Sequence, residues 1–191
     1  MKNLKRILFF GFVLISFVTK ISAQEAYSVK SHEVVISGTS NIHDWTAQVI
    51  NLSGLAKIAE GLLSEVKISV DAKTLKSSKG SIMDGKMQDA LNTKKFPKIN
   101  YKLISNKIVT ENSGIMKISS TGNLTISDVS RTITVTSICK TFQNENIELA
   151  GSFEILMTDF GIEPPTALFG SLKTANKVTV NFKITLQKSK V

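Results

Sequence analysis

The 191-residue sequence contains one cysteine, two histidines and three prolines. A lone cysteine, Cys139, excludes an intrachain disulfide framework and any zinc site built from several cysteines. His32 and His43 are too few for a histidine-rich metal centre, and no spacing of histidines and acids matches a set of metal ligands. The GxSxG motif of a nucleophile elbow is also absent. We therefore expect no metal, no other cofactor and no enzymatic activity.

One combination of residue types still raises the question of catalysis. Ser40, His43 and Asp44 are the residue types of a catalytic triad and lie close together in the sequence. His43 and Asp44 are adjacent, however, and adjacent residues of a strand point to opposite faces. We interpret His43 as the donor or acceptor of a structural hydrogen bond at a turn, beside a buried Trp45. Cys139 is in phase with apolar residues of its strand, so we expect a buried, small apolar side chain.

The N-terminus accounts for much of the positive charge. Residues 1–23 contain four basic residues, no acidic residue, and an apolar run of twelve residues from Ile7 to Val18. This run is short for a membrane span, which needs about 20 residues, and Ala23 is a suitable cleavage site for signal peptidase. We predict a signal peptide over residues 1–23 and a mature domain over 24–191, located in the periplasm or secreted.

Removal of this leader lowers the net charge from +9 to +5. A mildly basic chain of this kind gives little support to nucleic-acid binding, and we expect no nucleic-acid partner. The sequence gives no indication of the oligomeric state.

The mature chain alternates apolar and polar residues with a period of two, which is typical of half-buried antiparallel strands. The alternation is clearest in Lys177–Lys188, where Val178, Val180, Phe182, Ile184 and Leu186 share one face. It recurs in Val66–Val70, Ile99–Leu103, Met116–Ile126, Ile133–Val135 and Ile147–Ile155. Two less regular strands are expected near Tyr27–Ser37 and Ile42–Ser53. About eight strands with short turns predict an all-β sandwich or a closed antiparallel barrel.

One segment departs from this pattern. In Ser81–Asn92, Met83, Met87 and Leu91 recur every four residues and would share one face of a short helix. Ser81 is a suitable N-cap, and Phe96-Pro97 would end the irregular segment before the next strand. We expect this helix to cover one end of the β-structure.

Four segments, in order, resemble motifs of the YceI-like family. Gly38–Trp45 occupies the place of an early strand–turn motif. Met83–Met87 followed by Asn92–Tyr101 resembles "RDxHL … ydPxitF", Thr121–Arg131 resembles "tGdLTixgvtr", and Met157–Ile162 resembles "RsdFGi". The resemblance covers nearly the whole mature chain.

The resemblance implies an eight-stranded antiparallel lipocalin-like barrel, and the short helix expected from the spacing would lie near the barrel mouth. It also implies an elongated apolar cavity and a carrier of long isoprenoid-type lipids. Three positions depart from the family pattern: Met83 and Met157 replace arginines, and Met87 replaces leucine. Any function that depends on those arginines, such as pairing with an acidic head group, is not carried over to this chain.

The inward faces of such a barrel would line the cavity. We predict ligand contacts from the apolar strand residues, the helix and its flanking aromatic residues: Val66, Ile68, Val70, Met87, Leu91, Phe96, Tyr101, Leu103, Ile133, Val135, Phe153, Ile155 and Phe160. The same faces would also serve to fill a core that holds no ligand.

Lysines are concentrated around the predicted helix. The segment 73–98 holds seven lysines and two aspartates, a net charge of +5. Beside the barrel mouth this segment would form a positive rim, suited to a lipid phosphate or carboxylate and to transient contact with an anionic membrane surface. The alternative is a solvated loop whose lysines keep the protein soluble.

Two functions from different classes follow. The first is an extracytoplasmic binding protein that holds a long-chain apolar lipid, isoprenoid in type, inside its barrel. The second is a ligand-free structural or protein-interaction module of the cell envelope. A continuous internal cavity would favour the first, and a barrel filled by its own side chains would favour the second.

Overall fold

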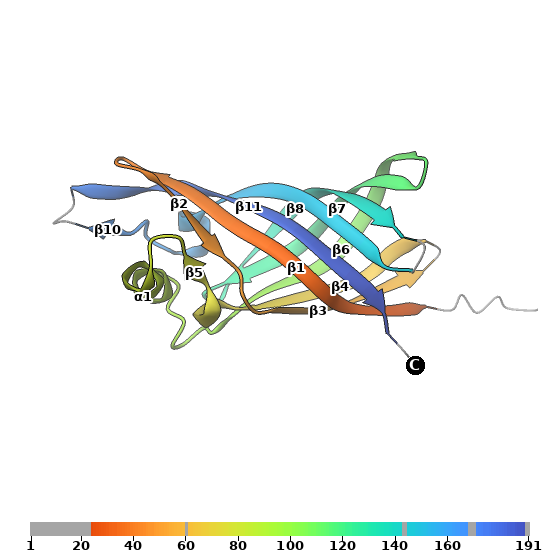
Figure 1. Cartoon of the computed structure of the whole chain (residues 1–191), viewed down its shortest axis with the longest axis horizontal. Coiled ribbons are helices and arrows are strands. Elements are labelled where there is room, and N and C mark those ends of the chain that lie inside the picture. Colours follow the sequence, from red (N-terminus) through yellow and green to blue (C-terminus); the bar gives the residue numbers. More distant parts are fainter. Residues whose placement is uncertain (1–23, 60, 143–144, 168–170, 190–191) are drawn as a thin grey trace, which may run out of the picture.

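The computed structural model describes residues 24–59, 61–142, 145–167 and 171–189. The predicted signal peptide, residues 1–23, lies outside the described residues. Eight strands form a closed antiparallel barrel, because β11, next to one end of the strand order, also pairs with β1 (Figure 1). In barrel order they are β1 (Glu25–Ser40), β3 (Leu52–Ala59), β4 (Leu62–Asp71), β6 (Lys98–Asn112), β7 (Ile115–Ile126), β8 (Val129–Thr141), β9 (Ile147–Leu156) and β11 (Leu172–Lys188).

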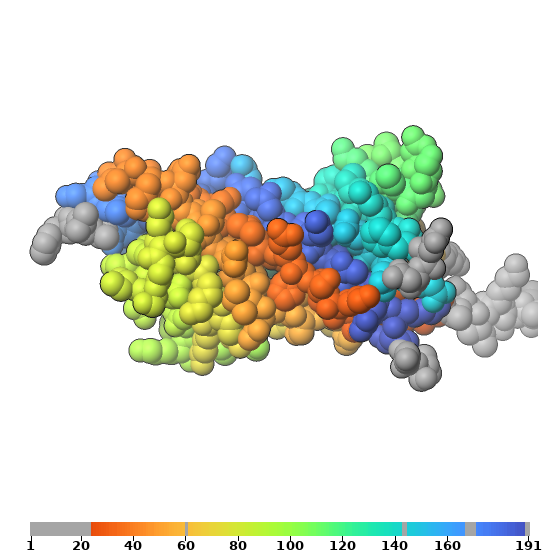
Figure 2. All heavy atoms as spheres, viewed as in Figure 1, coloured from red at the N-terminus to blue at the C-terminus, as the bar shows by residue number. Residues whose placement is uncertain are grey.

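The remaining elements gather at one end of the barrel (Figures 1 and 2). They are β2 (Asp44–Gln48), the 3₁₀ turn η1 (Ala72–Thr74), β5 (Lys76–Ser77), α1 (Ser81–Ala90), the 3₁₀ turn η2 (Met157–Phe160) and β10 (Thr166–Ala167). We call this the α1 end. No helix among the described residues has the length and apolar character needed to cross a membrane.

The prediction of a single second strand over Ile42–Ser53 was wrong. The long strand β1 pairs with β2 through Val35–Thr39 and with β3 through Glu25–Ser28, so the chain must leave the ladder between these two partners. Residues 49–51, which connect β2 to β3, form hydrogen bonds with other parts of the chain. Nε2 of His32 lies 3.3 Å from the Val49 carbonyl oxygen, and the Asp71 N–H donates to the Asn51 carbonyl. Backbone groups outside a ladder need such partners when they are not solvated.

Two tight turns keep neighbouring strands in register. Ser127 and Asp128 join β7 to β8 with φ values of 49° and 69°, and Ser113 and Gly114 join β6 to β7 with 49° and 78°. Two residues with positive φ are typical of hairpin turns whose twist matches that of the strands. These turns place the predicted inward residues of three consecutive strands on the same side of the sheet.

The predicted helix is present, but Ser81 is not its N-cap. Gly80, with φ of 87°, precedes the first helical residue, and no side chain caps the helix. Instead Asp84, 6% exposed, accepts hydrogen bonds from the Ser77 backbone N–H at 2.6 Å and from Lys76 Nζ at 3.0 Å. These two donors, the backbone N–H foremost, lower the pKa of the Asp84 carboxyl below its usual value. The first turn of α1 is therefore held to β5 by a buried carboxylate.

The end of the barrel opposite α1 is filled by side chains. Its buried core includes Tyr27, Ala56, Leu63, Ile118, Cys139, Ile147 and Leu186. Cys139 is a free thiol and is 4% exposed, so the expectation of a buried, small apolar side chain is confirmed. Burial also raises the pKa of this thiol, which disfavours the reactive thiolate.

Candidate ligand cavity

A cavity of about 410 Å³ occupies the barrel between this filled end and α1. Residues from all eight barrel strands and from α1 line it, and most of them are aliphatic or aromatic. Cavities that bind small molecules have volumes of about 300–1,000 Å³ and are mostly apolar. The barrel is therefore not completely filled by its own side chains.

Twelve of the thirteen residues that the sequence singled out line this cavity. They are Val66, Ile68, Val70, Met87, Leu91, Tyr101, Leu103, Ile133, Val135, Phe153, Ile155 and Phe160. Phe96 is not among the lining residues; its ring is partly buried beyond α1, with Lys95 Nζ 4.9 Å from the ring centroid. Whether the twelve residues contact a ligand stays a prediction.

A substantial part of the lining comes from residues that the sequence patterns did not single out as ligand contacts. The alternation of β11 already placed Val178, Val180, Phe182 and Ile184 on one face, and this face lines the cavity. On β1, Val34 and Ile36 line the wall, although the irregular pattern of this strand gave no clear inward face. Leu75, which follows η1 and is 1% exposed, had no periodic signal at all.

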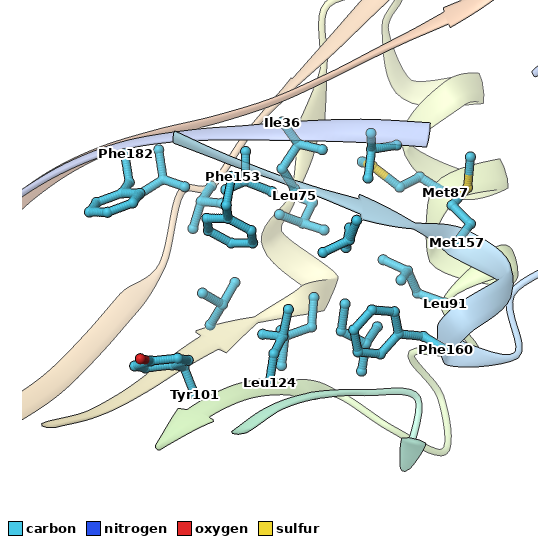
Figure 3. Close-up of a pocket in the computed structure, with 18 of the residues that line it drawn as sticks. Ile36, Leu75, Met87, Leu91, Tyr101, Leu124, Phe153, Met157, Phe160 and Phe182 are labelled. Carbon is cyan, nitrogen blue, oxygen red and sulfur yellow. The ribbon is translucent and has the colours of Figure 1, made fainter. Parts of the chain in front are cut away.

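Methionines line the α1 end of the cavity. Met83 and Met87 come from α1 and Met157 from η2, and Figure 3 shows Met87 and Met157 beside Leu91 and Phe160. All three positions depart from the family pattern described above, and two of them replace arginines. The flexible thioether side chain adapts to ligands of different shape. These three side chains are thus apolar and adaptable at positions where the family pattern has two arginines and a leucine.

Glycines in the wall leave room for large side chains of neighbouring strands. A Cβ atom at Gly122 would lie 2.5 Å from the Tyr101 ring, and one at Gly151 would lie 2.8 Å from the Phe182 ring. At Gly38 the same atom would come within 2.4 Å of the Trp45 ring. Each ring takes the space above a glycine on an adjacent strand. The glycines therefore let these rings lie against the wall and keep the centre of the barrel open.

Two polar groups in this wall have no partner among the described residues. The Tyr101 hydroxyl and the Trp45 indole N–H are buried and make no hydrogen bond there. Burial also raises the pKa of the Tyr101 phenol. An unsatisfied buried donor costs about 1–3 kcal/mol of stability, so each of these two groups destabilises a wall that is mostly apolar.

Three of the lining residues are exposed to solvent, and they mark the mouth of the cavity. They are His43 in the turn between β1 and β2, Lys79 just before α1, and Lys86 on α1. Ser40, Ser77 and Thr174 also line the cavity from elements at the α1 end. The mouth is therefore polar and carries two lysines, whereas the interior is apolar.

The arrangement around Ser40 does not form a catalytic triad. Ser40 Oγ donates to the His43 carbonyl at 2.8 Å and accepts from the His43 backbone N–H at 3.1 Å. The hydroxyl thus stabilises the β1–β2 turn, and no hydrogen bond joins it to the His43 ring. The expected hydrogen bond of the His43 side chain is replaced by these backbone contacts. Among the described residues, no group of three histidine, cysteine or acidic side chains is placed to hold a metal ion.

Comparison with known proteins gives one family and several similar structures. The family model described as "YceI-like domain" matches residues 19–186. No curated protein matches the chain.

Two solved structures share the fold over most of their length. A polyisoprenoid-binding domain from Saccharophagus degradans, implicated in plant cell wall breakdown, has a TM-score of 0.70 and 16% identity, covering 86% of this chain and 99% of that domain. BcnA from Burkholderia cenocepacia has a TM-score of 0.67 and 16% identity, covering 81% of this chain and 95% of BcnA.

A third, the YceI protein of Campylobacter jejuni, has a TM-score of 0.55 and 15% identity with full coverage of both chains. At sequence identities this low, the structural similarity establishes a common fold and nothing more.

Proposed function

Because this chain belongs to the YceI-like family, we propose that it is a lipid-binding protein that holds a long apolar chain, isoprenoid in type, inside its barrel. The observation that carries the proposal is the apolar cavity. Packed side chains close it at one end of the barrel, and it is open at the α1 end. The polyisoprenoid-binding domain with the same fold supports the ligand class. The protein acts by binding and not by catalysis.

The shape of the cavity fits a chain better than a compact polar molecule. Lining residues run from Leu63 and Leu186, beside the filled end, to Met83 and Lys86 at the mouth. Each CH₂ group removed from water contributes roughly 0.8 kcal/mol, so a long hydrocarbon chain gains affinity along this whole length. An open cavity favours this function over a ligand-free structural or interaction module, in which side chains would fill the barrel.

The polar mouth would hold the head group of the lipid. A chain that enters tail first leaves its head group beside Lys79, Lys86 and His43. Lysine attracts phosphate or carboxylate groups, so an anionic head would be favoured there. We further propose that residues 1–23 direct the protein out of the cytoplasm, so that it meets lipid in the periplasm or outside the cell.

Organic extraction and mass spectrometry test the proposal. Protein purified without detergent from cells that produce the full chain should release a long-chain lipid in near-stoichiometric amount. The variant Leu103→Phe adds a ring inside the cavity, and Ile104→Phe adds the same ring at a position that is 59% exposed. We expect less lipid from Leu103→Phe and unchanged lipid from Ile104→Phe.

Two results would contradict the proposal. The first is protein that carries no extractable lipid and takes up none from added polyprenol. The second is equal lipid content in several folded variants whose cavities have been filled.

A further inference from the structure

We propose that the α1 end is a membrane-docking surface that sets the mouth of the cavity against an anionic lipid bilayer. This inference rests on the proposed function, since a docked mouth matters for a protein that exchanges lipid. It draws on two features that lie beside the mouth, at the same end of the molecule: two exposed isoleucines and a set of exposed lysines.

The first feature is the position of exposed apolar side chains beside the mouth. Ile82 is 77% exposed and Ile42 is 59% exposed. Ile42 is adjacent to His43, and Ile82 lies four residues before Lys86 and so on the same face of α1. Each isoleucine is thus close to a residue that lines the mouth. Figures 1 and 2 show the β1–β2 tip in orange and the α1 segment in yellow-green at the same end of the barrel.

The second feature is charge. All seven lysines of the segment 73–98 are exposed. Only two of them form ion pairs among the described residues: Lys76 with Asp84 at 3.0 Å and Lys98 with Asp71 at 3.6 Å. The other five, which include Lys79 and Lys86 at the mouth, keep their charge available for a partner.

The combination identifies the chemistry of the partner. Exposed isoleucines among lysines match the two contacts that a peripheral protein makes with an anionic bilayer: apolar side chains enter the interface and lysines attract acidic head groups. An acidic protein surface would satisfy the lysines, but the isoleucines flank the opening of an apolar cavity. A bilayer satisfies both and also holds the ligand, so a lipid chain can pass between membrane and cavity with little exposure to water.

Vesicle flotation tests this surface. The full chain is produced, and the purified protein is mixed with vesicles of phosphatidylcholine alone or of phosphatidylcholine with phosphatidylglycerol. We expect flotation with the anionic vesicles and much less with the zwitterionic ones, and weaker binding at high salt because the lysine contribution is screened.

The variant Ile42→Ser/Ile82→Ser removes the apolar contacts. Partial insertion of two isoleucines is expected to contribute roughly tenfold or more in affinity, so this variant should bind anionic vesicles at least about tenfold more weakly. The matched control is Leu55→Ser/Ile104→Ser, since these side chains are 61% and 59% exposed on the barrel wall. The control should float like the unmodified protein.

Several results would overturn the inference. They are no flotation with either vesicle, which would leave the surface to a protein partner; equal flotation with both vesicles; or equal losses in the two double variants. Lipid extraction from the same samples separates this inference from the proposed function. Retained lipid without vesicle binding would reject the docking surface alone, and vesicle binding by protein that never carries lipid would reject the proposed function alone.

Discussion

Tyr101 has a buried hydroxyl that makes no hydrogen bond among the described residues, in a wall that is mostly apolar. Phenylalanine keeps the ring and removes the unsatisfied group. We expect Tyr101→Phe to be as stable as the unmodified protein or more stable by up to about 1 kcal/mol, measured by urea unfolding of lipid-free protein. Lower stability, or a loss of bound lipid, would mean that the hydroxyl has a partner in the cavity, such as the ligand itself.

Gly122 tests how the cavity is kept open. A Cβ at this position would lie 2.5 Å from the Tyr101 ring, so Gly122→Ala should push the ring toward the centre of the barrel. We expect a loss of roughly 1–3 kcal/mol in stability from this overpacking, together with reduced lipid content. Adding Tyr101→Leu should recover part of both losses, because residues in contact couple energetically.

Gly85 provides the matched control for this substitution. No atom outside the helix backbone lies within 4 Å of a Cβ built there, and alanine favours helix more than glycine does. Gly85→Ala should therefore leave lipid content unchanged and keep or raise stability. If Gly122→Ala behaves in the same way, the glycine does not keep the cavity open.

At the scale of elements, α1 is a short helix that depends on contacts with other parts of the chain. A helix of ten residues is marginal in isolation, and side-chain hydrogen bonds hold it in place. Asp84 binds β5, Gln88 Nε2 donates to the Lys73 carbonyl at 2.9 Å, and Ser127 Oγ donates to the Leu91 carbonyl at 2.8 Å. The apolar face of α1, with Met83 and Met87, covers the cavity. We expect α1 to act as a lid that opens when lipid enters or leaves.

Lipid should therefore stabilise α1 against local opening. We expect amide exchange in residues 81–96 to slow when lipid is bound, because the ligand adds apolar contacts to a segment of low local stability. Methionine oxidation gives an independent measurement with an internal control. Met83, Met87 and Met157 should be protected by lipid, whereas Met116, at the other end of the barrel and outside the cavity lining, should not. Identical exchange and oxidation with and without lipid would reject the lid.

The elements also show how far sequence patterns reach. Strict alternation located β4, β6, β7, β8, β9 and β11, and it assigned their inward faces, because a buried face fixes register. It failed between Ile42 and Ser53, where the two short strands β2 and β3 both pair with β1 and the chain between them forms hydrogen bonds with distant residues.

Contacts of α1 and its flanking residues could not be predicted from the sequence. The hydrogen bond between Asp84 and Ser77 depends on where the fold places β5. Phe96 was assigned to the cavity because it is aromatic and next to the helix, but only the path of the chain after α1 decides where its ring lies.

At the scale of the whole molecule, the cavity reduces the stability of the ligand-free protein. Side chains around an empty space lose packing contacts that a lipid would restore. A ligand at a hundredfold excess over its Kd stabilises the folded state by about 2.7 kcal/mol. For a chain of this length, each kcal/mol added to the free energy of unfolding raises Tm by about 2–4 °C. Added polyprenol should therefore raise the Tm of delipidated protein by roughly 5–10 °C. The Leu103→Phe variant should respond less, and an unchanged Tm in the unmodified protein would contradict a ligand inside the barrel.

The central claim is that the lipid chain lies inside the barrel, and nuclear Overhauser contacts between lipid protons and labelled protein methyl groups measure this most directly. Three pairs of nearby methyl groups separate the inside from the outside: Leu103 and Ile104 on β6, Val135 and Ile138 on β8, and Ile155 and Leu156 on β9. We predict contacts from the lipid chain to Leu103, Val135 and Ile155, and none to their exposed neighbours. Contacts to Ile104, Ile138 and Leu156 alone, or no contact to any of the six in protein that retains lipid, would contradict the account.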